Sequence, residues 1–143
     1  MNNRKYIGVP TQDEIIQQYN EILELTKGIV TYKQVKELVK SNPNIEVEVN
    51  YDSIYNYSKM PNGELKSDFI TNIKDEDIEA IRYEYKNILV YCNIENGKSS
   101  YSNYITLYSD EGDQFGDEKY YDYEKEIERV AKMGLLKLNP NFN

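Results

Sequence analysis

Nine carboxylates lie within the 19-residue stretch 110–128, which reads DEGDQFGDEKYYDYEKEIE. They are Asp110, Glu111, Asp113, Asp117, Glu118, Asp122, Glu124, Glu126 and Glu128. Two lysines are the only cations of this stretch, which therefore carries seven of the eight net negative charges of the chain. Closely spaced carboxylates suit three chemistries: proton transfer in catalysis, coordination of a hard cation, and attraction of a basic partner.

Cation coordination requires a spacing that this stretch does not have. A calcium loop places oxygen ligands at positions 1, 3 and 5, glycine at position 6 and glutamate at position 12. A loop starting at Asp113 puts Phe115 at the third position and Glu118 where glycine is needed. A loop starting at Asp110 puts Gly112 and Gln114 at the third and fifth positions. We therefore expect no specific metal site.

Catalysis is restricted by the residue types that the chain lacks. There is no histidine, so a Ser-His-Asp or Cys-His arrangement is excluded. The only cysteine, Cys92, falls on the expected inward face of a strand, where a thiol behaves as a small apolar group. The phosphate-binding motifs G-x-x-x-x-G-K-[ST] and G-x-G-x-x-G are both absent from the sequence. No carboxylate pair stands out as a catalytic pair. We expect a protein that is not an enzyme and uses no cofactor.

Attraction of a basic partner is the chemistry that the acidic stretch favours. On a helix, Glu118, Asp122 and Glu126 form one row, with about 6 Å between neighbours. This spacing is close to that of successive phosphates on a nucleic-acid strand. Part of the charge could instead serve surface ion pairs, Glu126 with Arg129 and Glu128 with Lys132. We expect the nine carboxylates, together with Tyr121, to bind a basic protein surface such as that of a nuclease.

The expected function is that of an inhibitor or decoy that blocks a nucleic-acid-binding surface of another protein. Anti-CRISPR and antirestriction proteins of phages and mobile elements share this small size and acidity, which is an analogy of charge and size alone. Three alternatives stay open: an immunity protein against a basic nuclease toxin, a small-ligand domain that binds a nucleotide, and a helix-turn-helix-like regulator. The regulator would use the lysines at 33, 36 and 40, but the net charge of −8 opposes DNA binding.

Two helices are expected at the start of the chain. Thr11 and Glu14 form a capping-box pattern, apolar residues then recur at helical spacing, and Gly28 provides a stop, which predicts a helix over 12–27. Thr31 can cap a second helix that ends before Pro43.

A sheet is expected after Pro43, where the apolar period changes from 3.6 to 2. Residues 45–51 alternate as a strand, and 54–57 and 65–73 could form a hairpin around the turn at 60–63. An Asn96-Gly97 turn would place Glu95 opposite Lys98, Cys92 opposite Tyr101 and Ile88 opposite Ile105. A second turn at 86–87 would pair Tyr85 with Ile88, Tyr83 with Val90 and Ile81 with Cys92. The segment 76–86 fits a helix or a strand, and its strict alternation favours a strand.

The last expected element is an amphipathic helix over 117–137, whose apolar side runs from Tyr120 to Leu135. The order predicts one α+β domain over 1–143: two N-terminal helices, an antiparallel sheet of five or six strands, and a C-terminal helix packed on one sheet face. With one cysteine and no run of 18 apolar residues, we expect a soluble cytoplasmic protein that binds neither membranes nor nucleic acid.

Overall fold

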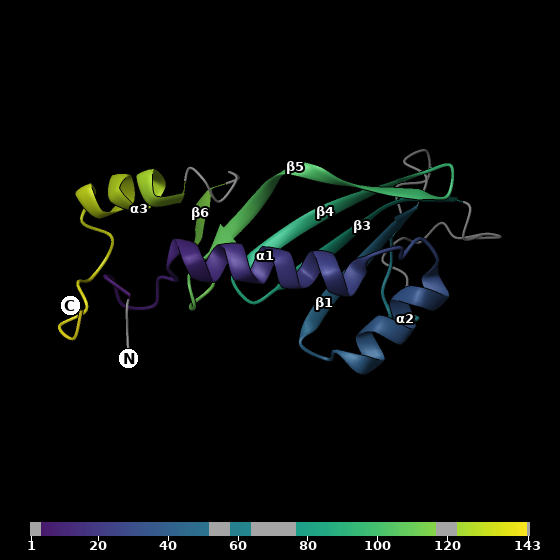
Figure 1. Ribbon diagram of the computed structural model, residues 1–143, viewed down its shortest axis with the longest axis horizontal. Helices are drawn as coiled ribbons and strands as arrows, with labels where there is room; N and C mark the ends of the chain where they lie inside the picture. Colours follow the sequence, from purple (N-terminus) through teal and green to yellow (C-terminus); the bar gives the residue numbers. More distant parts are fainter. Residues whose placement is uncertain (1–3, 52–57, 64–76, 117–122, 143) are drawn as a thin grey trace.

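The computed structural model describes residues 4–51, 58–63, 77–116 and 123–142 (Figure 1). Within these ranges three helices and six strands follow one another as α1 (Gln12–Thr26), α2 (Tyr32–Ser41), β1 (Ile45–Tyr51), β2 (Ser58–Lys59), β3 (Ile78–Tyr85), β4 (Ile88–Glu95), β5 (Lys98–Tyr108), β6 (Gln114–Gly116) and α3 (Tyr123–Lys132). The strands form one antiparallel sheet in the order β2-β1-β3-β4-β5-β6. The predicted α+β class is confirmed, and the ambiguous segment is a strand from Ile78 onward.

The N-terminal helices begin at the expected residues. The hydroxyl of Thr11 accepts a hydrogen bond from the backbone N–H of Glu14 at 3.1 Å. The reciprocal capping box forms at the second helix, between Thr31 and Gln34, whereas the side chain of Glu14 binds Arg4. Gly28 has a φ of +76°, the left-handed conformation expected just after a helix end.

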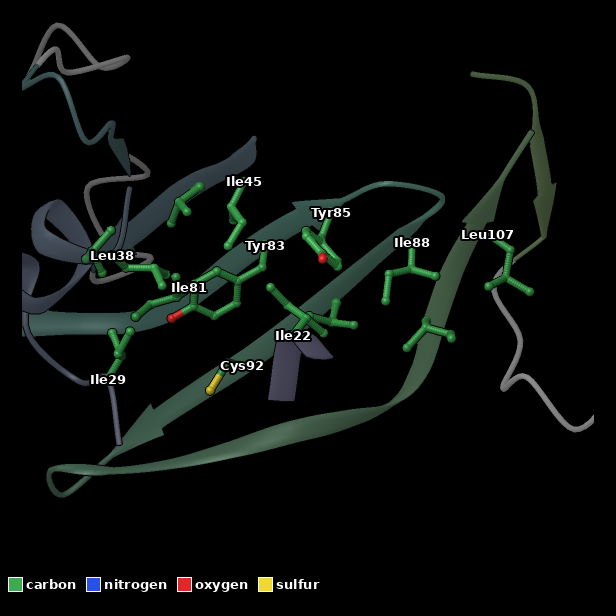
Figure 2. Packing of buried hydrophobic residues seen from close by; sticks show 14 of the residues in the cluster. Ile22, Ile29, Leu38, Ile45, Ile81, Tyr83, Tyr85, Ile88, Cys92 and Leu107 are labelled. Atoms are coloured by element: carbon green, nitrogen blue, oxygen red, sulfur yellow. The ribbon is translucent and has the colours of Figure 1, made fainter. Parts of the chain in front are cut away.

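The core lies between one face of the sheet and the helices. Figure 1 shows α1 running across the sheet, with α2 beside β1. Ile15 and Ile22 of α1 are fully buried, and so are Ile81 and Tyr83 of β3, which alternate with more exposed residues. Figure 2 shows this apolar cluster around Tyr83. The period-2 pattern in the sequence therefore identified the face of the sheet that is buried.

The hairpin registers agree with the sequence at the turns and differ further along β5. All three pairs expected around the 86–87 turn are present. Glu95 lies opposite Lys98 and Cys92 opposite Tyr101, but Ile88 pairs with Leu107, so the expected pairing with Ile105 is wrong. A bulge explains the difference, because β5 contains two more residues than β4 between the Cys92 pair and the Val90 pair.

The C-terminal helix is shorter than expected. It ends at Lys132, and Gly134 follows with a φ of +76°, so the predicted extension to residue 137 is wrong. Leu135 consequently lies beyond the helix and is 67% exposed. Tyr123 and Ile127 join the core from α3, as do Tyr6 and Val9 from the N-terminal segment. The expected helical residues 117–122, and most of the expected hairpin around 60–63, lie outside the described residues.

Candidate partner-binding surface

The acidic stretch borders the N-terminal segment 4–11 on two sides. Residues 110–113 form the loop between β5 and β6, and the backbone N–H of Asp110 donates to the carbonyl of Gly8 at 2.8 Å. Glu124, Glu126 and Glu128 lie on α3. The other four expected binding residues, Asp117, Glu118, Tyr121 and Asp122, lie outside the described part of the chain.

Three of the described carboxylates form ion pairs within the protein. Asp110 pairs with Arg4 at 2.5 Å, Glu126 with Arg129 at 2.5 Å, and Glu128 with Lys5 at 3.5 Å. The expected Glu126 pair is confirmed. The expected partner of Glu128 was Lys132, and Lys5 of the N-terminal segment takes its place. These pairs reduce the charge that the three carboxylates offer to another molecule.

Glu111, Asp113 and Glu124 are the described carboxylates of the stretch that remain available. All three are exposed, and none forms an ion pair with another residue in the described ranges. The carboxylate of Glu111 lies over Gly8, where a Cβ atom would come within 2.5 Å of Oε2. The absent side chain at Gly8 thus lets the acidic loop pack closely on the N-terminal segment.

An apolar groove lies beside the α3 carboxylates. It has a volume of about 280 Å³ and is lined by residues of the N-terminal segment and α3. Val9, Tyr123 and Ile127 are buried members of this lining, and the exposed Glu124 and Glu128 are also part of it. Lys5 also lines the groove and pairs with Glu128, so Glu124 is the lining carboxylate that remains for another cation. An apolar pocket with a carboxylate beside it is suited to a side chain that carries both an apolar stem and a positive charge.

A second, polar cavity has a volume of about 520 Å³ and includes Asp110 in its lining. Its charged groups bind one another: Arg4 bonds to both Glu14 and Asp110, and Lys86 pairs with Glu21 at 3.4 Å. Burial raises the pKa of Asp110, but the hydrogen bond from Asn87 and the ion pair with Arg4 together lower it by more, so the net pKa lies below its ordinary value. These contacts hold the start of the acidic loop in place.

The buried amides of Gln18 and Asn87 connect this cavity to the core. Gln18 Nε2 donates to Asn87 Oδ1 at 2.9 Å, and the backbone N–H of Asn87 donates to Gln18 Oε1 at 3.0 Å. Asn87 Nδ2 also donates to the carbonyl of Tyr108 and to Asp110 Oδ1. Sequence reasoning identified 86–87 as a turn but missed this network, because the burial of an amide in a turn has no local signal.

The other candidate chemistries receive no support from the geometry. The thiol of Cys92 is 1% exposed, and burial raises its pKa, which disfavours the thiolate. No group of three potential metal ligands occurs among the residues that the structure describes. Every helix in the described ranges is too short or too polar to span a bilayer. Comparison with known proteins finds no matching protein family, curated protein or solved structure.

Proposed function

We propose that the protein is a non-enzymatic binding protein of the cytoplasm that inhibits a basic partner, in the manner of anti-CRISPR or antirestriction proteins. Its acidic surface, which we define as Glu111, Asp113 and Glu124 with the adjoining carboxylates of 110–128, would occupy a nucleic-acid-binding surface of that partner. The observation that carries this proposal is that these three exposed carboxylates lack ion-pair partners among the described residues.

The groove beside α3 supplies an apolar contact next to Glu124. Protein interfaces derive most of their affinity from a few well-packed anchors, whereas surrounding charges mainly set the association rate and the choice of partner. A lysine or arginine of the partner that enters the groove would place its stem against Val9 and Ile127 and its charge near Glu124. The acidic surface and the groove together favour a basic protein as the ligand.

The experiment compares two variants with the same change of charge. Glu111, Asp113 and Glu124 are replaced by lysine in the first variant. Glu24, Glu79 and Glu95, which are exposed and lie outside the acidic stretch, are replaced by lysine in the control. Affinity capture from the native host, followed by competition with nucleic acid, identifies the partner and the surface of the partner that is occupied.

We expect the parent and the control to recover the same basic nucleic-acid-binding protein, and the first variant to lose it. Nucleic acid should release the partner, because both would occupy the same surface. Equal recovery by all three proteins, or a partner that nucleic acid does not displace, would contradict the proposal. A nuclease toxin as the recovered partner would identify an immunity protein, and a CRISPR effector would identify an anti-CRISPR protein.

A further inference from the structure

A basic hollow lies beside α2, at the end of the molecule opposite α3 (Figure 1). It has a volume of about 790 Å³ and is lined by α2, by β2 and by the turn that follows β2. Four lysines line it, three from α2 and one from β2: Lys33, Lys36, Lys40 and Lys59. Among the described residues of the lining, Glu37 is the only carboxylate. These five described residues together carry a charge of +3, although the whole chain carries −8.

Tyr32 links α2 to the turn after β2 within this hollow. Its ring is 8% exposed, and its hydroxyl donates a hydrogen bond to the carbonyl of Met60, in the turn after β2. The ammonium of Lys59 lies 4.0 Å from the centroid of this ring, and that of Lys36 lies 5.8 Å from it. Both distances are within the range of cation–π attraction. The ring of Tyr32 thus attracts the ammonium group of Lys36 on α2 and that of Lys59 on β2 toward the same part of the hollow.

The lysine ammonium groups have no anionic partner within the described ranges. None of the four lysines forms an ion pair there. Ammonium groups gathered in this way repel one another, and a bound anion relieves the repulsion. The sequence shows three of these lysines on one helix but not the fourth, because β2 is brought to α2 only by the fold.

We propose that this hollow binds an oligophosphate group, either as free polyphosphate or as the phosphate chain of a nucleotide. Lysine is a compact donor of three hydrogen bonds and a common ligand for phosphate. A lining charge of +3 suits an anion with several charges better than a single phosphate or a carboxylate. The volume lies in the range of small-molecule sites, which run from about 300 to 1,000 Å³.

A long nucleic acid fits these observations less well than a small anion. The rest of the chain carries −11, since the whole carries −8 and the lining carries +3. A nucleic acid extends beyond the hollow into this negative field, whereas an oligophosphate stays within it. Tyr32 is also too deeply buried to stack on a base, which is how single strands gain much of their affinity.

The test is isothermal titration calorimetry with sodium tripolyphosphate, with ATP, and with a short single-stranded DNA, each at low salt. The site variant carries Lys36→Gln and Lys59→Gln. The control carries Lys125→Gln and Lys132→Gln, which remove the same charge from α3, at the opposite end of the long axis (Figure 1). A thermal melt of each protein verifies that the substitutions, three at exposed positions and one at the half-buried Lys59, leave the fold intact.

We expect saturable binding of tripolyphosphate and ATP to the parent and the control. In the site variant both affinities should fall by at least about tenfold, because two charge-assisted contacts are removed. Equal affinities for the two probes would assign the site to the phosphate chain alone, and tighter ATP binding would assign it to a nucleotide. The proposal is overturned by an absence of saturable binding, by an equal loss in the control, or by tighter binding of the single strand. Partner capture by the acidic surface is a separate measurement and does not depend on this result.

Discussion

The guanidinium of Arg4 lies 2.5 Å from the carboxylate of Asp110, 106 residues further along the chain. Arg4 also bonds to Glu14 at the start of α1, with nitrogen–oxygen distances of 2.8 to 3.2 Å. One side chain thus ties the N-terminal segment to the first helix and to the beginning of the acidic loop. The binding surface that we propose depends on this tie, because Glu111 and Asp113 follow directly after Asp110.

Replacing Arg4 with glutamine should destabilise the protein by about 1 kcal/mol, since the groups are partly exposed and solvent screens the pair. The expected fall in Tm is about 3 °C for a chain of this size. Lys98→Gln, an exposed substitution elsewhere, serves as the control and should leave the Tm unchanged. An unaltered Tm in both variants would show that the Arg4 contacts add nothing to stability.

The same pair predicts a dependence of stability on pH. The pKa of Asp110 is lower in the folded protein than in the unfolded chain, where it is about 3.9. The stabilisation is therefore complete above the unfolded pKa and is lost as the pH falls through the folded pKa. Urea unfolding of the parent and of Arg4→Gln should show their largest difference at neutral pH. The two curves should converge in acid, and a gap that widens in acid would contradict this assignment.

Tyr83 and Tyr123 offer an internal comparison of two buried hydroxyl groups. The hydroxyl of Tyr83 has no hydrogen-bond partner in the described structure, whereas that of Tyr123 donates to the carbonyl of Pro10 at 2.5 Å. Tyr83→Phe should stabilise the protein by about 1 kcal/mol, because it removes an unsatisfied buried group. Tyr123→Phe should destabilise it by about 1 kcal/mol, because it leaves a carbonyl without its donor. Thermal melts that change in the same direction for both variants would contradict this difference.

The backbone conformation of the turn between β4 and β5 predicts that a substitution at Gly97 lowers stability. Asn96 and Gly97 have φ angles of +53° and +73°, as a type I′ turn requires. Gly97→Val should cost about 2 kcal/mol, because a β-branched residue strongly resists a positive φ. Ser100→Val, at an exposed position of the following strand, is the matched control and should have little effect. Equal unfolding midpoints for the two variants in urea would mean that this turn does not fix the register.

A cross-strand pair of carboxylates should give stability a pH dependence of the opposite sign from that expected for Asp110. Glu46 of β1 lies opposite Glu84 of β3, and burial, together with the charge of Glu46, raises the pKa of Glu84. The charged form is therefore penalised in the folded state, so stability falls as the pH rises through the interval between the unfolded and the folded pKa. Glu84→Gln should raise stability at neutral pH by about 0.5 kcal/mol, with no gain in acid. A gain of equal size at both pH values would exclude an electrostatic cause.

Local signals predicted the elements of this fold well, and its distant contacts poorly. Helix caps at Thr11 and Thr31 and the turn at Asn96-Gly97 are decided by neighbouring residues, so the sequence displays them directly. The bulge in β5 and the pairing of Lys5 with Glu128 depend on how separate segments pack, and neither has a local pattern.

The candidate sites likewise combine features that the sequence displays locally with contacts that depend on how separate segments pack. Charge counting located the acidic stretch, and residue spacing predicted the pair of Glu126 with Arg129. Only the structure shows that Arg4 is the partner of Asp110 and that Lys5 is the partner of Glu128. The choice of Glu111, Asp113 and Glu124 for the capture experiment comes from that finding.

The charge distribution predicts that duplex DNA does not bind the protein at physiological salt. The Debye length is then about 8 Å, so the acidic field still acts at contact range, and the net charge of −8 opposes the phosphate contacts whose counterion release drives DNA binding. The triple lysine variant at Glu111, Asp113 and Glu124 has a net charge of −2, because each substitution changes the charge by two, and its repulsion should be weaker. Fluorescence anisotropy with a labelled duplex at low and moderate salt measures both proteins. Tight parental binding that weakens steeply with salt would reject the inhibitor in favour of a DNA-binding regulator.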